Sequence, residues 1–123
     1  MATQADLTET LEQYPMLFEE GLFTDKQTAL EFYSGNESKM LSRRDIPLDE
    51  FVSAVEWMEG RTLLKDAGGR DSQAWKKVME KATREYVCDG AFLAAALYLN
   101  VPLNQDMANP YPLLGIKEQK GDF

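Results

Sequence analysis

The feature that most constrains this chain is a nine-residue stretch that has no polar face. Ala91–Leu99 reads Ala-Phe-Leu-Ala-Ala-Ala-Leu-Tyr-Leu and contains no charged side chain. A helix that is apolar all round is normally buried, because it has no side to present to water. The stretch is too short to cross a bilayer, which needs about 20 apolar residues. We therefore predict a central buried helix, whose small alanines let neighbouring helices approach closely.

Amphipathic patterns elsewhere in the chain predict the helices that surround this central one. Apolar residues recur at spacings of three and four, which is the period of one helix face. The first pattern ends at Pro15, because proline removes a backbone donor and restricts the residue before it. The expected stripes are Leu7, Leu11 and Tyr14; Ala29, Leu30, Phe32 and Tyr33; Phe51, Val52, Val55 and Met58; and Trp75, Val78, Met79, Ala82 and Tyr86.

Local signals predict where these helices begin and end. Residues 24–27 run from Thr to Gln in the form of a capping box. Asp71 or Ser72 is expected to cap the helix that carries the fourth stripe. Gly35 is a suitable left-handed stop. Residues 16–18 fit one further helical turn after the first helix. Around Met40 and Leu41 a short helical turn is expected within a polar connection.

The pattern changes after Asn100, where prolines at positions 102, 110 and 112 exclude a regular helix. Apolar residues nevertheless continue along this segment. We expect residues 1–102 to form a helical domain and residues 103–123 an extended, proline-containing C-terminal tail. The predicted fold class is all-α, a small bundle of about four to six helices. Long segments without secondary structure are uncommon in compact domains unless they are functional or disordered.

The tail is the main candidate for a binding surface. Its prolines pre-set an extended backbone, which lowers the entropy lost on docking. Its apolar side chains are suited to pockets on a protein partner or on a sister subunit, so a homo-oligomer formed through the tail is one expectation. The alternative is that the tail folds back and covers the helices of its own domain. The candidate binding residues are Tyr111, Leu113, Leu114 and Ile116.

Charge is distributed unevenly along the chain. The net charge is −8, and residues 1–40 hold eight acids against two bases, which places −6 in that third. An acidic surface disfavours direct contact with nucleic acid and with anionic membranes, whose binding depends on Lys and Arg. It favours a protein partner with a basic surface, because opposite fields steer association. Glu19 and Glu20, which are adjacent in the acidic third, are candidate contacts for such a partner.

The absence of histidine limits the chemistry that is available. It removes the usual general acid–base, the Ser-His and Cys-His nucleophile pairs and the commonest metal ligand. Cys88 is the only cysteine, so no intramolecular disulfide can form, and we expect it to be a buried structural residue. These features predict a protein that is not an enzyme and uses no cofactor or metal. Without a recognisable leader or membrane segment, a cytoplasmic location is expected.

Two further features bear on binding. Trp57 falls off the apolar stripe of its helix, so we expect it to be partly exposed, where tryptophans are frequent interface hot spots. Arg43 and Arg44, with three other bases, form a candidate basic patch. Such a patch could bind an acidic partner or a phosphate, but we expect these charges to be solvated or balanced by the acidic N-terminal third of the same chain. The other three bases are Arg61, Lys65 and Arg70.

The function predicted from these features is that of a small acidic helical protein-binding module. It would be an assembly adaptor or an inhibitor that docks on a larger protein complex, with a size and composition common among phage and mobile-element accessory proteins. The first alternative is an acidic nucleic-acid mimic that occupies the basic groove of a DNA-binding protein. The second is a carboxylate- and metal-dependent enzyme, for which Glu19–Glu20 or Asp49–Glu50 would supply the ligands.

Overall fold

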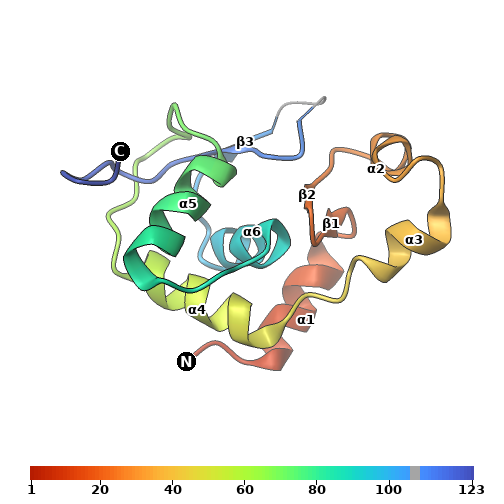
Figure 1. The fold of residues 1–123 in the computed structure, drawn as a ribbon, viewed down its shortest axis with the longest axis horizontal. Coiled ribbons are helices and arrows are strands. Elements are labelled where there is room, and N and C mark those ends of the chain that lie inside the picture. Colours follow the sequence, from red (N-terminus) through yellow and green to blue (C-terminus); the bar gives the residue numbers. More distant parts are fainter. Residues whose placement is uncertain (106–108) are drawn as a thin grey trace.

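A computed structural model shows a central helix surrounded by the rest of the chain (Figure 1). The structure describes residues 1–105 and 109–123. Within these residues it contains six helices and two antiparallel pairs of short strands. The fold is mostly helical, as predicted, but the two strand pairs are a correction to the all-α class. In chain order the elements are α1 Gln4–Gln13, β1 Leu17–Phe18, β2 Gly21–Leu22, α2 Lys26–Phe32, α3 Glu37–Ser42, α4 Leu48–Glu59, α5 Ser72–Thr83, α6 Asp89–Tyr98, β3 Leu103–Asn104 and β4 Leu113–Leu114.

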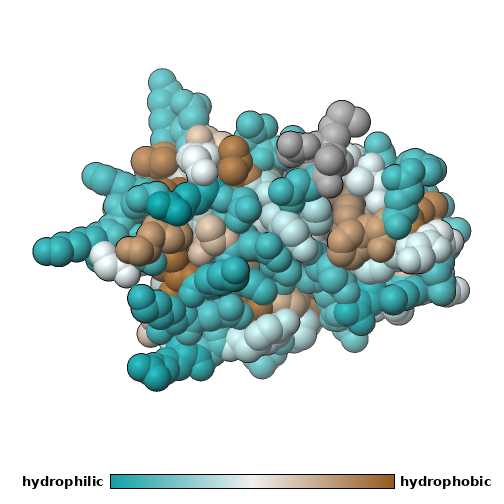
Figure 2. All heavy atoms as spheres, turned by 45° about the horizontal axis from the view of Figure 1, so that its top comes forward, coloured by the Kyte–Doolittle hydropathy of each residue, from teal (hydrophilic) through white to brown (hydrophobic). Residues whose placement is uncertain are grey.

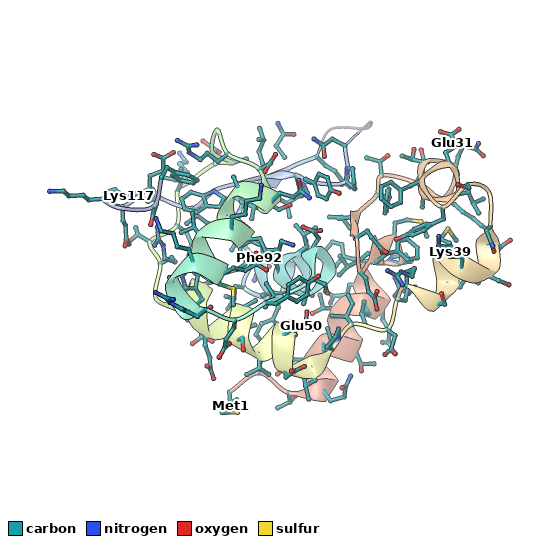
Figure 3. The ribbon with its side chains drawn as sticks, in the orientation of Figure 1. Met1, Glu31, Lys39, Glu50, Phe92 and Lys117 are labelled. Carbon is teal, nitrogen blue, oxygen red and sulfur yellow. The ribbon has the colours of Figure 1, made fainter. Side chains whose placement is uncertain are left out.

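The helix α6 forms the centre of the molecule, which confirms the prediction of a buried central helix. Its residues from Gly90 to Leu97 are all buried. It packs against α1, α4, α5 and the β1–β2 strand pair, and Figure 3 shows Phe92 in the middle of the molecule. At its first turn the backbone touches the hairpin, because a Cβ on Gly90 would lie 2.8 Å from the Cα of Glu19. None of the helices in the described ranges is long and apolar enough to cross a membrane.

Most predicted helix boundaries agree with the structure. The helix α1 ends before Pro15. Asp71 caps α5, because its carboxylate accepts a hydrogen bond from the Ala74 amide at 2.9 Å. After α2, Gly35 has a φ of +74°, as expected of a left-handed stop. The cap of α2 is a correction. Asp25 rather than Thr24 caps this helix, because its carboxylate accepts from the Thr28 amide at 2.8 Å.

Residues 16–18 do not continue as helix but enter a β-hairpin. Leu17 pairs with Leu22 and Phe18 with Gly21, which leaves Glu19 and Glu20 as a two-residue turn. The physical reason is that neighbouring strand residues point to opposite faces. Leu17 joins the main core, whereas Phe18 joins a second apolar cluster around α2 and α3. That second cluster consists of Phe18, Phe23, Ala29, Tyr33 and Met40.

Residues 109–123, which we call the C-terminal segment, lie against the helical domain, whereas residues 106–108 of the predicted tail lie outside the described residues. The strand β4 of this segment pairs with β3, and isolated bridges join Leu113 to Asp71 and Ile116 to Leu63. Backbone hydrogen bonds connect it to the loop between α4 and α5, as in Gly68 N–H to Leu114 O at 3.1 Å. The segment thus follows the alternative in which it covers its own helices.

Candidate functional site

A hollow of about 500 Å³ lies between the end of α1, the β1–β2 hairpin and the end of α6, and we call it the apolar groove. Most of its walls are apolar. In the view of Figure 2, hydrophobic side chains are seen at the right, over the region of α2, and also at the left of the molecule. The lining residues are Gln13, Tyr14, Pro15, Met16, Leu22, Phe23, Thr24, Leu97, Asn100, Val101, Leu103 and Gln105.

One wall of the apolar groove is the C-terminal end of α6. Asn100 has a φ of +57°, and its amide donates to Leu97 O at 3.2 Å, while the Val101 amide donates to Ala96 O at 2.9 Å. These two bonds make a Schellman motif, in which a left-handed residue ends the helix and satisfies its last carbonyls. Asn is one of the few residues that tolerate this conformation. The motif turns the chain sharply and fixes Leu97 and Val101 in the wall.

The opposite wall is the turn that follows α1. Pro15 ends the helix, and the Leu17 amide closes the turn by donating to Tyr14 O at 3.1 Å. The guanidinium of Arg44 fastens the same turn, because it donates to Pro15 O at 2.7 Å and to Leu11 O at 2.6 Å. The turn is therefore fixed both by its own backbone hydrogen bond and by the side chain of Arg44.

The polar side chains of the apolar groove carry amides and hydroxyls and no charge. The side chain of Gln105 donates to Leu22 O at 2.9 Å and joins the hairpin to the segment after α6. Gln13, Thr24 and Asn100 are exposed at the groove. Tyr14 is the only ionisable residue among the described lining residues. Such a surface offers apolar contact and neutral hydrogen bonds, which suits binding.

A smaller hollow of about 270 Å³ adjoins the apolar groove, and we call it the acidic shelf. The two hollows share Gln13, Leu97 and Asn100. Asp6 raises the pKa of Tyr98 above its ordinary value through its negative charge, with burial adding to the effect. The shelf is lined by Asp6, Glu9, Thr10, Gln13, Leu97, Tyr98 and Asn100.

The candidate residues of the tail differ in accessibility. Leu114 and Ile116 are 0% and 2% exposed and belong to the main core, so neither can reach a partner while the domain stays folded. Tyr111 and Leu113 are half-buried. The four residues lie close in sequence, but only the latter two keep exposed surface.

Glu19 and Glu20 form the turn of the β1–β2 hairpin, where both carboxylates form ion pairs with Arg43. Tyr33 also donates to Glu20, with 2.6 Å between the oxygens. Burial raises the pKa of Glu20, but the bonds from Arg43 and Tyr33 outweigh it and leave that pKa lowered. For Glu19, burial outweighs the attraction of Arg43 and the pKa is raised. The turn is thus an ion-paired structural element.

The arginines of the candidate basic patch are largely engaged within the chain. Arg61 pairs with Asp122 and Arg70 with Glu118, each at 2.5 Å, in addition to the pairing of Arg43 with the hairpin turn. The expected balance by the acidic N-terminal third holds for Arg43, whereas Arg44 donates to backbone carbonyl oxygens instead. For Arg61 and Arg70, the acids come from the C-terminal segment.

Trp57 is half-buried on α4, which confirms its expected partial exposure. Its ring centroid lies 6.0 Å from that of Phe92, and the guanidinium carbon of Arg61 lies 5.0 Å from the Trp57 ring centroid. The residue therefore connects the central helix to the surface, and its role as a binding hot spot stays a prediction.

Cys88 is the N-cap of α6, with its sulfur accepting from the Ala91 amide at 3.3 Å. Its own amide donates to a carboxylate oxygen of Glu50 at 2.6 Å. Burial raises the pKa of the thiol to about 12, so it is protonated at neutral pH. A structural cysteine fits this position. Among the described residues, no three Cys, Asp or Glu side chains converge in a way that would hold a metal ion.

Comparisons of the chain with protein-family models, with curated proteins and with solved structures gave no match.

Proposed function

We propose that this chain is a non-enzymatic protein-binding module, of the adaptor or inhibitor kind, that holds a segment of its partner in the apolar groove. The observation that carries the proposal is the groove itself, about 500 Å³ between three secondary-structure elements. Its lining supplies apolar walls and neutral amides, which bury a side chain and orient the attached backbone. These groups favour recognition over bond-breaking chemistry.

The size of the apolar groove supports the same proposal. Ligand pockets in proteins commonly have volumes of about 300–1,000 Å³, and the apolar groove falls within this range. The walls are held by the Schellman motif and by the Arg44 bonds, so little order has to be gained on binding. The nucleic-acid mimic has less support, because Arg43 pairs with Glu19 and Glu20, and Lys26 pairs with Glu37.

Two substitutions that fill the apolar groove test the proposal. Gln13→Trp and Thr24→Trp place a large ring at exposed positions of the lining. We expect affinity purification from the native host to recover a partner with the unchanged chain and to lose it with both variants. Gln119→Trp, at an exposed position outside the groove, is the matched control and should keep the partner. Equal recovery of the partner with the unchanged chain and with all three variants would contradict the proposal.

A further inference from the structure

We infer that the segment bound by the apolar groove carries a large apolar side chain directly beside one or more lysines or arginines. This inference rests on the proposed function and names the chemistry of the partner. It follows from the position of the acidic shelf, which shares three lining residues with the apolar groove. A ligand that fills one hollow therefore brings its neighbouring residues to the other.

The charge of the acidic shelf comes from two carboxylates on one face of α1. Asp6 and Glu9 are three residues apart, which places their side chains on the same side of the helix. Glu9 is exposed and Asp6 is half-buried. In the described part of the chain, no lysine or arginine lines either hollow. The carboxylate of Asp6 accepts hydrogen bonds from the amide and the hydroxyl of Thr3 in the capping box of α1. The negative charge at the end of the apolar surface is therefore carried by the exposed Glu9 together with this hydrogen-bonded Asp6.

Neighbouring groups agree with this assignment of charge. Arg44 is an exception, because its guanidinium stays charged while it donates to the carbonyl oxygens of residues 11, 14, 15 and 17 beside the apolar groove, but Arg44 lines neither hollow. The negative charges of the shelf raise the pKa of the Tyr98 phenol. The charge of Asp6 has the largest effect, and the charges of Glu59 and Glu9 have smaller ones. A cation from a partner would relieve this local excess of negative charge.

The charge of the surrounding chain extends the same field. Residues 1–40 carry −6, one unit of which is offset by the ion pairs of Arg43 with Glu19 and Glu20, and both hollows take lining residues from this third. Such a field speeds the encounter with a positively charged segment, and its effect falls as salt shortens the screening length. The inference therefore predicts binding that depends on salt and on the sign of the ligand's charge.

Two synthetic peptides separate apolar from electrostatic recognition. Both are amphipathic helices with the same leucine face, and their polar faces carry only lysine in one and only glutamate in the other. We expect the lysine peptide to shift the Leu97 and Val101 amide signals of the full, nitrogen-15-labelled chain. Its dissociation constant should rise about tenfold when the salt concentration is raised from about 20 mM to about 500 mM. The glutamate peptide should leave both signals unchanged.

A charge reversal on the shelf gives the matched test. Glu9→Lys should weaken the lysine peptide about fivefold, because it replaces an attraction with a repulsion at the surface. Glu85→Lys makes the same change at an exposed residue outside both hollows and should have little effect.

The possible outcomes distinguish the inference from the proposed function. Equal, salt-independent binding of both peptides would overturn the inference and leave the apolar groove as a docking site. Binding of neither peptide would overturn both. If the same amide signals change with protein concentration when no peptide is present, a second copy of the chain covers the groove, and the inference fails.

Discussion

At the scale of single residues, two adjacent arginines have different roles. Arg43 is half-exposed and pairs with Glu19 and Glu20 across the hairpin turn. Arg44 donates instead to backbone carbonyls at the end of α1 and in the turn after it, with no carboxylate partner among the described residues. Burial lowers its pKa, but an arginine stays charged in any case. The sequence shows only Arg-Arg, so this division depends on the tertiary structure.

The two arginines should therefore differ in their effect on stability. We expect Arg44→Met to lower the free energy of unfolding by about 2–4 kcal/mol, because several partly buried carbonyls lose a charged donor. Arg43→Met should cost about 1 kcal/mol or less, as for other exposed ion pairs. Urea unfolding followed by circular dichroism measures both. Similar losses for the two variants would show that the turn after α1 does not depend on Arg44.

At the scale of secondary-structure elements, the helices could be predicted and the strands could not. The apolar stretch of α6 and the stripes of α4 and α5 are local patterns, so they can be recognised without a fold. The hairpin is different, because Leu17 and Phe18 are both apolar and are buried in two separate clusters. Only the positions of those clusters decide between a turn of helix and a strand. The strand β4 could not be predicted from the sequence either, because its partner β3 and the residues that form bridges with it come from separate parts of the chain.

The strand β4 gives a prediction with its own internal control. Leu114 is fully buried, whereas its neighbour Leu113 is half-buried on the other face of the strand. We expect Leu114→Ala to lower the free energy of unfolding by about 3 kcal/mol, because it removes apolar contacts and leaves a cavity. Leu113→Ala should cost about 1 kcal/mol. Urea titration measures the difference, and a larger loss at Leu113 would contradict the placement of this strand.

At the scale of the whole molecule, the apolar groove was beyond what the sequence could predict. Its lining comes from two stretches that are far apart in the chain, residues 13–24 at the end of α1 and in the hairpin region, and residues 97–105 at the end of α6 and after it. Pro15 and Asn100 do mark the two helix ends that form its walls. What could not be read locally is that these two ends lie beside one another. The acidic character of the neighbouring shelf was predictable in outline, from the charge of residues 1–40.

The placement of the C-terminal segment predicts that residues 1–102 depend on it. A chain that ends at residue 102 lacks Leu114 and Ile116 and leaves the core beneath them open to water. We expect it to lose the cooperative urea transition seen by tryptophan fluorescence and circular dichroism. A chain that ends at residue 117 keeps β4 and should retain a cooperative transition at a lower midpoint. An unchanged midpoint for the shorter chain would mean that the helices are stable alone.

The bond from the Gln105 side chain to Leu22 O has a consequence for the rate of folding. It joins positions 83 residues apart, and the bonds from Arg61 to Asp122 join positions 61 residues apart. Contacts between such distant positions require large loops to close before they contribute any stability. A bundle of helices with only local contacts folds in microseconds to milliseconds, and this chain should be slower. The groove wall that contains Gln105 should be among the last parts to form.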